Sequence, residues 1–267
     1  MLANFHTHST FCDGKNTPED VVLAAIEKGF CAIGFSGHGY TPFDLRYCMK
    51  DTEGYSAEIN RLKEKYKDKI QIYLGVEEDA FHPLDRSRFD YIIGSSHYFC
   101  LDGKYLPIDS SHEYFKKCLE AFFYDTHRLA ETYYGAFCAY INQRKPDIIG
   151  HFDLITKFDE LGESLFLKDG KYQAIARGAA IEAVKSGSLF EVNTGAITRG
   201  MRTSVYPSED ILFTLRNEEA GLILSSDSHE IATLDGCFAE TRAYLYDMGF
   251  RHLYTLFNGE LMKYDIK

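Results

Sequence analysis

The chain is poor in basic residues, long apolar runs and leader-like segments, and each shortage excludes a class of protein. Its 267 residues include 29 Lys and Arg against 40 Asp and Glu, a net charge of −11. Nucleic-acid-binding proteins usually present a basic face, so we expect no nucleic-acid partner. No stretch approaches the roughly 20 apolar residues that cross a bilayer, so we expect no membrane partner. No basic and apolar leader precedes the first histidines, which predicts a cytoplasmic protein if the mature chain starts at Met1.

The seven cysteines are scattered along the chain, and no two of them form a Cys-x-x-Cys pair. Single cysteines of this kind are typical of a reducing compartment, where they serve as packing residues. The pattern therefore argues against a disulfide scaffold, a zinc finger and an iron–sulfur site.

Seven short apolar runs recur along the chain, and each ends near a residue that can bind a metal or a substrate. The runs span residues 2–5, 31–35, 70–76, 91–94, 148–150, 189–192 and 222–224. Their length is typical of buried strands. Apolar residues make up 45% of the sequence, which is enough for a full core, and we predict a single domain over residues 1–267.

Helical segments separate most of these runs. Thr17 followed by Pro18 is typical of a helix start, and Gly29 is expected just past the end of that helix. Further helices are predicted over residues 55–66, 111–142, 173–186 and 208–220, with the longest segment broken in two near Gly135. Strands that alternate with helices favour parallel strands joined by right-handed crossovers.

The predicted fold class is α/β, with seven strand–helix units in a closed or nearly closed barrel. Active sites of such barrels lie at the C-terminal ends of the strands, where the candidate ligands of this chain also fall. A doubly wound open sheet is the alternative, but it would not gather residues from seven strand ends around one point. Asn258-Gly259, between residues 252–257 and 260–264, predicts a small hairpin after the barrel.

Histidines and carboxylates at the strand ends predict a metal centre. His6 and His8 face the same side if residues 2–8 form a strand, and Asp227 and His229 repeat this spacing. The candidate ligands are His6, His8, Asp13, His38, Glu77, His97, His151, Asp227 and His229. Such mixed donors suit zinc, iron(II) or manganese. Nine donors are too many for one ion, so we predict two or three divalent ions, a device used in phosphate ester hydrolysis.

These residues also carry a resemblance to a known family. The resembling motifs, in chain order, are His6-x-His8, Asp13, Ser36-Gly37-His38, Gly75-Val76-Glu77, Gly94-Ser95-Ser96-His97, Gly150-His151-Phe152-Asp153 and Ser226-Asp227-Ser228-His229. They resemble the motifs of the PHP (polymerase and histidinol phosphatase) metallo-hydrolases over nearly the whole chain. The resemblance implies a distorted (β/α)7 barrel with a three-metal site.

Within that family the sequence is most similar to the stand-alone histidinol-phosphate phosphatases. Chain length, the Gly150-His151-Phe152-Asp153 segment and the Glu191-Val192-Asn193-Thr194 segment followed by arginine carry this similarity. It implies a phosphoric monoester hydrolase that converts L-histidinol phosphate to L-histidinol and phosphate in histidine biosynthesis. The implied partner is thus a small phosphorylated substrate, and the oligomeric state stays open.

The resemblance also implies a ligand set for each ion. His6, His8, Glu77 and Asp227 would hold one ion; Glu77, His97 and His151 would hold a second, with Glu77 as the bridge; and Asp13, His38 and His229 would hold the third. Some family members have histidine in place of Asp13, and a carboxylate there would make the third site harder. Glu78 is the alternative bridge, since consecutive residues of a strand face opposite sides.

Catalytic and substrate-binding roles follow from the same resemblance and from the chemistry of phosphate. Asp227, His229 and Arg199 are the predicted catalytic residues. Arg199, Arg202 and Asp153 are the predicted substrate-binding residues, because a guanidinium fork matches phosphate geometry and a carboxylate matches a cationic aminoalcohol. Phe152 and Tyr206 are candidates for an aromatic wall.

Three other functions are open to the same sequence. One is a PHP phosphoesterase that acts on another phosphomonoester or on nucleotide or oligonucleotide ends, against which the acidic balance weighs. Another is a metal-binding or regulatory domain with a vestigial site, against which the complete set of ligands weighs. The last is an amidohydrolase-type barrel, which also begins with His-x-His but usually has a metal-bridging lysine at a strand end.

Overall fold

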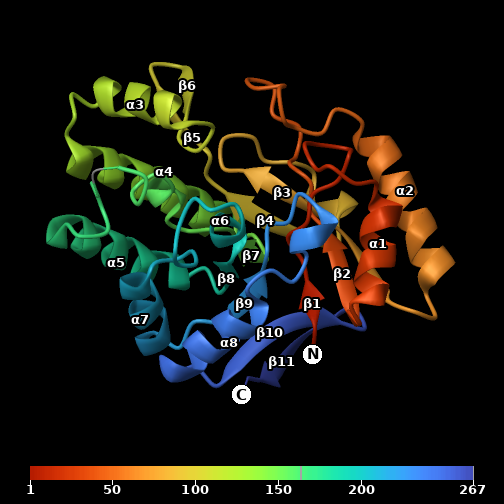
Figure 1. Cartoon of the computed structure of the whole chain (residues 1–267). Helices are drawn as coiled ribbons and strands as arrows, with labels where there is room; N and C mark the ends of the chain where they lie inside the picture. Colours follow the sequence, from red (N-terminus) through yellow and green to blue (C-terminus); the bar gives the residue numbers. More distant parts are fainter. Residues whose placement is uncertain (163, 267) are drawn as a thin grey trace.

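The computed structural model describes residues 1–162 and 164–266 and is built on parallel strands flanked by helices (Figure 1). All seven predicted runs form strands, and these are β1 (Ala3–Asn4), β2 (Ala32–Phe35), β3 (Gln71–Asp79), β4 (Tyr91–Ser95), β7 (Ile148–Ile149), β8 (Leu189–Asn193) and β9 (Leu222–Ser225). They lie side by side in this order, and every neighbouring pair is parallel. Their C-terminal ends therefore meet at one face of the molecule.

The first and last of these strands close the ring at that face. Thr7, just beyond β1, forms a parallel bridge with Ser228, just beyond β9. The His8 amide donates to the Ser228 carbonyl at 2.8 Å, and the Ser228 amide donates to the His6 carbonyl at 3.2 Å. Below this point the side chain of Asn4 spans the gap and donates to Ser226 Oγ at 2.7 Å. The result is the distorted (β/α)7 barrel that the resemblance implied.

The barrel is distorted because β9 changes partners along its length. At its start β9 pairs with β10 (His252–Phe257), which forms an antiparallel hairpin with β11 (Glu260–Asp265). Asn258 and Gly259, with φ of +53° and +76°, form the predicted turn. The hairpin and both chain termini lie at the bottom of the molecule in Figure 1, at the end opposite to the strand ends that carry the candidate ligands.

The lower half of the barrel is filled with side chains. Phe5 and Tyr91 lie there with their rings perpendicular, and the Tyr91 hydroxyl donates to the Phe5 carbonyl at 2.5 Å. A Cβ at Gly75 would come within 2.2 Å of the Tyr91 ring, so that position admits no larger residue. The interior is thus a packed core below and a polar site above, as is usual for such barrels.

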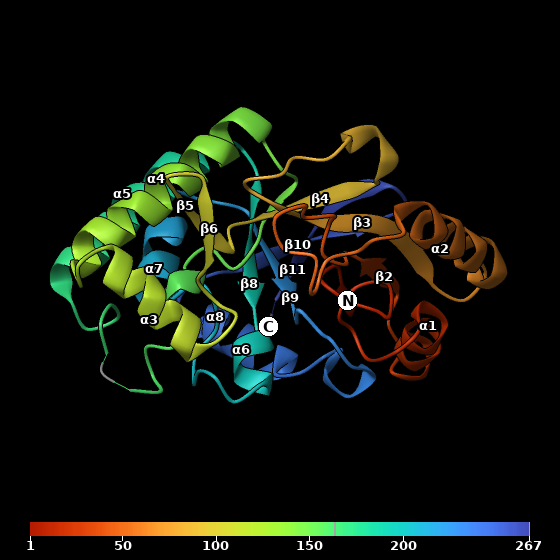
Figure 2. The same cartoon turned by 90° about the horizontal axis from the view of Figure 1, so that it is seen from above.

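The long helices are α1 (Pro18–Glu27), α2 (Thr52–Tyr66), α3 (His112–Ala121), α4 (Thr126–Arg144), α5 (Gly170–Val184), α7 (Glu209–Asn217) and α8 (Phe238–Asp247). In Figure 2 α1 and α2 lie on one side of the strands, and α4 and α5 lie on the other. Thr17 caps α1 as predicted, in a reciprocal pair of hydrogen bonds with Asp20. No helix within the described part of the chain is long and apolar enough to cross a membrane.

The predicted break near Gly135 is wrong. Gly135 lies inside α4, and the chain turns earlier, between α3 and α4. Phe123 and Tyr124 occupy the left-handed region there, with φ of +54° and +60°, and Asp125 caps α4 by accepting from the Arg128 amide at 3.0 Å. A single glycine inside a helix costs only about 1 kcal/mol relative to alanine, so packing of α4 outweighs it.

Four elements were not predicted. A hairpin of β5 (Tyr98–Leu101) and β6 (Lys104–Pro107) follows β4, a short helix α6 (Gly195–Thr198) follows β8, and α8 precedes β10. Short 3₁₀ turns cover Arg86–Arg88, Leu154–Thr156 and Ile231–Thr233. That residues 1–267 form one domain stays a prediction.

Candidate metal centre

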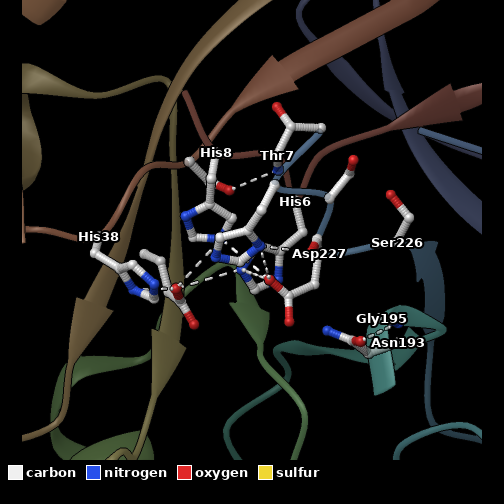
Figure 3. A network of polar contacts seen from close by, with 12 residues as sticks. His6, Thr7, His8, His38, Asn193, Gly195, Ser226 and Asp227 are labelled. Atoms are coloured by element: carbon white, nitrogen blue, oxygen red, sulfur yellow. Dashed lines mark hydrogen bonds and ion pairs between the residues drawn. The ribbon is translucent and has the colours of Figure 1, made fainter. Parts of the chain in front are cut away.

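All nine candidate ligands meet at the C-terminal ends of the strands. Figure 3 shows His6, His8, His38 and Asp227 turned toward one another from the ends of β1, β2 and β9. Donor atoms closer than 4.8 Å to one another form four groups, namely His8/Asp13/His38/His229, His6/Glu77/His151, His6/His8/Asp227 and His38/Glu77/His97. The groups share members, so the donors form one continuous cluster.

Glu77 lies at the middle of this cluster. Its Oε1 lies 2.9 Å from His151 Nε2 and 3.2 Å from His97 Nε2. Its Oε2 lies 2.7 Å from His38 Nδ1 and 3.4 Å from His6 Nε2. The two oxygens of one carboxylate therefore face different imidazoles, which is the arrangement that a bridging ligand needs.

Glu78 faces the opposite side of β3 and belongs to a different network. Its carboxylate accepts from Arg144 Nε at 2.7 Å and from Arg144 Nη2 at 2.8 Å. The Tyr140 hydroxyl and the Leu84 amide also donate to it, both at 2.6 Å. Both Glu78 oxygens thus have protein donors, whereas Glu77 faces the histidines.

Buried atoms without hydrogen-bond partners indicate where a cation fits. Among the described residues, His6 Nε2, His8 Nε2 and Glu77 Oε2 are buried and have no partner with the geometry of a hydrogen bond, although Glu77 Oε2 lies 2.7 Å from His38 Nδ1. Asp227 Oδ1 lies 3.1 Å from His8 Nε2 and 3.7 Å from His6 Nε2. Leaving such atoms unpaired costs about 1–3 kcal/mol each, and a divalent cation bound by these nitrogen and oxygen donors would remove that cost.

The group around Asp13 is nearer to solvent. Asp13 Oδ2 lies 3.4 Å from His229 Nε2, and Asp13 Oδ1 lies 3.6 Å from His38 Nε2. The Asp13 side chain is 35% exposed, against 0% for Glu77. These three are the residues expected around the third ion, and they lie on the outer side of the cluster.

The cluster shifts the pKa values of its members. Burial raises the pKa of Glu77, but the His38 and His6 imidazoles outweigh it and lower the pKa well below its usual range. Burial also opposes ionisation of Asp227, but the Arg199 guanidinium outweighs it and the pKa falls. Burial, together with His229 and His38, lowers the pKa of His8 to about 3. His8 is therefore neutral near pH 7 and its lone pair is free for a metal.

Further polar groups hold the imidazoles from behind. Glu191, fully buried on β8, accepts from His6 Nδ1 at 2.6 Å and from the His151 amide at 2.8 Å. Asp79 Oδ2 lies 3.3 Å from His97 Nδ1. Because the Nδ1–H of His6 donates to Glu191, Nε2 is the ring nitrogen that faces the cluster. The sequence marked the Glu191 segment as a family feature but did not predict this contact.

Residues 4–195 match the family model of the PHP domain, which is most of the chain. The chain belongs to the PHP family. A PHP relative from Schizosaccharomyces pombe, named "Probable histidinol-phosphatase", is 31% identical over 86% of this chain and 81% of its own length. The histidinol-phosphatase of Bacillus subtilis is 25% identical over 84% of this chain and 92% of its own.

A solved structure shows the same fold. The histidinol phosphate phosphatase of Lactococcus lactis subsp. lactis, crystallised with zinc, L-histidinol and phosphate, superposes with a TM-score of 0.73 at 21% identity. The superposition covers 97% of this chain and 98% of that one. Membership of the PHP family and this likeness support the barrel described above and disfavour the doubly wound sheet.

The PHP chain has a cavity of about 420 Å³ beside the cluster, and this cavity is open to solvent. Arg199 borders it and donates from Nη2 to Asp227 Oδ2 and from Nη1 to the Asp227 carbonyl, both at 2.8 Å. Two of the five N–H groups of this guanidinium donate to Asp227, and Nη1 also lies 3.5 Å from His229 Nδ1. The described residues offer no further acceptor, so the remaining N–H groups can bind an anion. Of the three predicted substrate-binding residues, Arg199 is the one that borders the cavity.

Arg202 and Asp153 lie elsewhere. Both side chains are fully buried, and neither is among the residues that line the cavity. Asp153 accepts from the Ser208 amide at 2.9 Å, and Arg202 donates to Thr156 Oγ1 at 2.9 Å above the Tyr206 ring. They join the segment after β7 to the segment before α7. Phe152 and Tyr206, the candidates for the aromatic wall, are also buried.

Nine other residues line the cavity and were not predicted, and the polar ones used below are Asp44, Tyr47, Asp109 and Lys157. Lys157 follows β7 closely enough that the strand-end pattern could have marked it. Asp44 and Tyr47 come from the long loop between β2 and α2, and Asp109 follows the β5–β6 hairpin. No motif or spacing in the sequence marks these three.

Proposed function

We propose that this PHP protein is a histidinol-phosphatase, a phosphoric monoester hydrolase that converts L-histidinol phosphate to L-histidinol and phosphate in histidine biosynthesis. The observation that carries the proposal is the convergence of nine metal-binding side chains on one cavity bordered by an arginine. The curated relatives quoted above carry histidinol-phosphatase names, and the Lactococcus structure was crystallised with L-histidinol and phosphate. A cytoplasmic location stays a prediction.

We assign the nine residues to two or three divalent ions, with zinc, iron and manganese as the metals that suit the donors. His6, His8, Glu77 and Asp227 would hold one ion, Glu77, His97 and His151 a second, and Asp13, His38 and His229 the third. When bound, such ions activate water and offset the charge of a phosphate. Glu77 is preferred over Glu78 as the bridge because its two oxygens face different histidines.

Asp227, His229 and Arg199 are the residues to which we assign catalytic roles. The Arg199 guanidinium keeps free N–H groups at the cavity and would bind the equatorial oxygens of the phosphate. Asp227 holds that guanidinium through two hydrogen bonds. The Nδ1–H of His229 donates to the Asp227 carbonyl at 3.0 Å, so Nε2 is the ring nitrogen that faces Asp13. Asp227 therefore orients both Arg199 and His229.

Substrate contacts of Asp153 and Arg202 stay predictions. The geometry favours a structural role, in which both side chains hold protein segments in place. Each bonds to the segments that lie next to the cavity, and neither borders it. We propose that they hold the loop that carries Arg199. Their loss would then affect every phosphate ester equally.

Metal analysis of the purified protein, combined with phosphate release from a substrate panel, tests the proposed function. The panel contains L-histidinol phosphate, nucleoside monophosphates and simple sugar phosphates. We expect about two to three metal ions per chain and turnover that strongly favours L-histidinol phosphate. Metal-free active protein would contradict the metal centre. Equal turnover of all esters, or a preference for nucleotides, would contradict the substrate and favour a different PHP phosphoesterase.

A further inference from the structure

The cavity has two chemically different ends. Candidate ligands and Arg199 form its inner end, which suits a phosphate group. Its outer wall comes from the loop between β2 and α2 and from the segment after the β5–β6 hairpin. Asp44 and Asp109 are the carboxylates that this outer wall presents within the described residues. A substrate that carries a positive charge as well as a phosphate would meet one of them.

Asp44 has no free acceptor. Its Oδ1 accepts from the Arg46 amide at 3.1 Å and from Arg46 Nε at 2.8 Å. Its Oδ2 accepts from Arg46 Nη2 at 2.6 Å and from the Tyr98 hydroxyl at 3.0 Å. The side chain is only 8% exposed. Asp44 therefore stabilises its loop and has little capacity to bind a ligand.

Asp109 is different because one of its oxygens is free. Lys157 Nζ lies 3.2 Å from Asp109 Oδ2 and 2.8 Å from the Asp109 carbonyl, which orients the carboxylate. No donor among the described residues contacts Asp109 Oδ1, and the side chain is 26% exposed. An oriented carboxylate oxygen at a cavity wall is a good acceptor for an ammonium group.

The hairpin explains why this carboxylate lies close to the inner end. β5 begins directly after His97, and the return strand β6 brings Pro107 opposite Tyr98. The Ile108 amide then donates to the His97 carbonyl at 2.9 Å. Asp109 consequently follows Ile108, which is hydrogen-bonded to the candidate ligand His97. Asp109 itself belongs to none of the metal-binding groups.

We propose that Asp109 recognises the ammonium group of the substrate and so selects cationic phosphomonoesters. The inference rests on the proposed function. In L-histidinol phosphate the amine sits on the carbon next to the ester carbon, so the ammonium lies only a few bonds from the phosphate. A carboxylate beside the inner end of the cavity matches that spacing. The free Oδ1 of Asp109 accepts from the ammonium, while Lys157 keeps the carboxylate in place.

The test compares two variants on two esters. The esters are L-histidinol phosphate and 3-(imidazol-4-yl)propyl phosphate, which lacks only the amine. The variants are Asp109→Asn and the matched control Asp44→Asn, which alters a carboxylate of the same wall that has no free oxygen. We expect Asp109→Asn to lower kcat/KM for L-histidinol phosphate by about 10- to 100-fold, mainly through KM, with little change for the amine-free ester.

The ratio of the two kcat/KM values is the deciding quantity, because a loss of folded or metal-loaded protein cancels in it. We expect Asp44→Asn to change kcat/KM for both esters by the same factor. The role of Asp109 would be overturned if Asp109→Asn kept the wild-type ratio of the two kcat/KM values. It would also be overturned if Asp44→Asn lowered that ratio as much as Asp109→Asn does. Either result would leave the proposed function intact. Wild-type protein without preference for L-histidinol phosphate over the panel esters would instead overturn the proposed function, and this inference with it.

Discussion

At the scale of single residues, two consecutive glutamates on β3 take separate roles because a strand alternates its faces. Glu77 faces the histidines at the centre of the barrel, and Glu78 faces Arg144 and Tyr140 on α4. Both are fully buried, so burial does not distinguish them. The difference lies in their partners, and it can be tested.

We predict that Glu77→Gln lowers the metal content and abolishes phosphate release, because it removes the charge that faces several imidazoles. The matched variant Glu78→Gln should keep its metal content. It should lower the free energy of unfolding by about 3 kcal/mol, since the buried Glu78 side chain loses the charge that pairs with the partly buried Arg144. Metal analysis and urea denaturation measure both effects. Loss of metal in the Glu78 variant alone would show that the bridge was assigned to the wrong residue.

Glu191 gives a second prediction at this scale. Glu191→Gln should weaken metal binding by about 10- to 100-fold, because the carboxylate that holds the Nδ1 proton of His6 loses its charge. Competition with a chromogenic chelator measures the affinity. Glu182→Gln is the control, since that residue lies on the outer surface of α5 with a 47% exposed side chain. An unchanged affinity in Glu191→Gln would mean that His6 is oriented by packing alone.

At the scale of elements, short apolar runs identified the strands well, and helix ends were identified less well. Thr17, Pro18 and Gly29 marked α1 because capping and left-handed glycine are local effects. The turn between α3 and α4 places Phe123, 86% exposed, at positive φ, which no local rule favours for an aromatic residue. Packing of the two helices determines that turn.

The corrected helix boundary leads to a prediction. Gly135→Ala should raise the free energy of unfolding by about 0.5–1 kcal/mol, because the position is inside α4 and a Cβ there meets nothing within 4 Å. The urea midpoint measures this. Gly29→Ala is the matched control and should destabilise by about 1 kcal/mol, since Gly29 has φ of +77°. Destabilisation by Gly135→Ala would instead support a helix break at that residue.

At the scale of the whole molecule, the metal cluster and the closure of the barrel depend on each other. β1 and β9 meet through the β-bridge of Thr7 and Ser228 and through the side chain of Asn4, and both strands carry candidate ligands directly beside the bridge. An ion bound by His6, His8 and Asp227 would join the first and last strands of the barrel. Metal binding should therefore contribute to the stability of the fold as well as to catalysis.

We predict that chelation lowers the Tm, and that the loss is larger at pH 8.5 than at pH 6.5. Burial lowers the pKa of His6 and of His97, but neighbouring carboxylates outweigh it and raise both well above the usual value. In the metal-free protein this stabilisation is complete below the unfolded pKa of about 6.5 and is lost as the pH rises through the folded values. His8, whose pKa is lowered to about 3, is neutral in the folded protein throughout this window, and its unfolded form is mostly neutral above pH 7.

Differential scanning calorimetry of metal-loaded and chelated protein from pH 6.5 to 8.5 measures the difference. The Tm of the metal-loaded protein should change less with pH, because bound ions replace the protons of His6 and His97. A Tm difference that shrinks as the pH rises would contradict the assignment of His6 and His97 to the metal centre.

The sequence by itself determined the seven strands, the α/β class, the nine candidate ligands and the resemblance to the PHP family. It could do so because strand length, side-chain alternation and donor chemistry are properties of short segments. The tertiary structure decided which glutamate faces the cluster, that Arg199 borders the cavity while Arg202 and Asp153 are buried, and that Asp109 lines the outer wall. These depend on contacts between segments distant in the chain, such as the β5–β6 hairpin returning to His97, and no local pattern encodes such contacts.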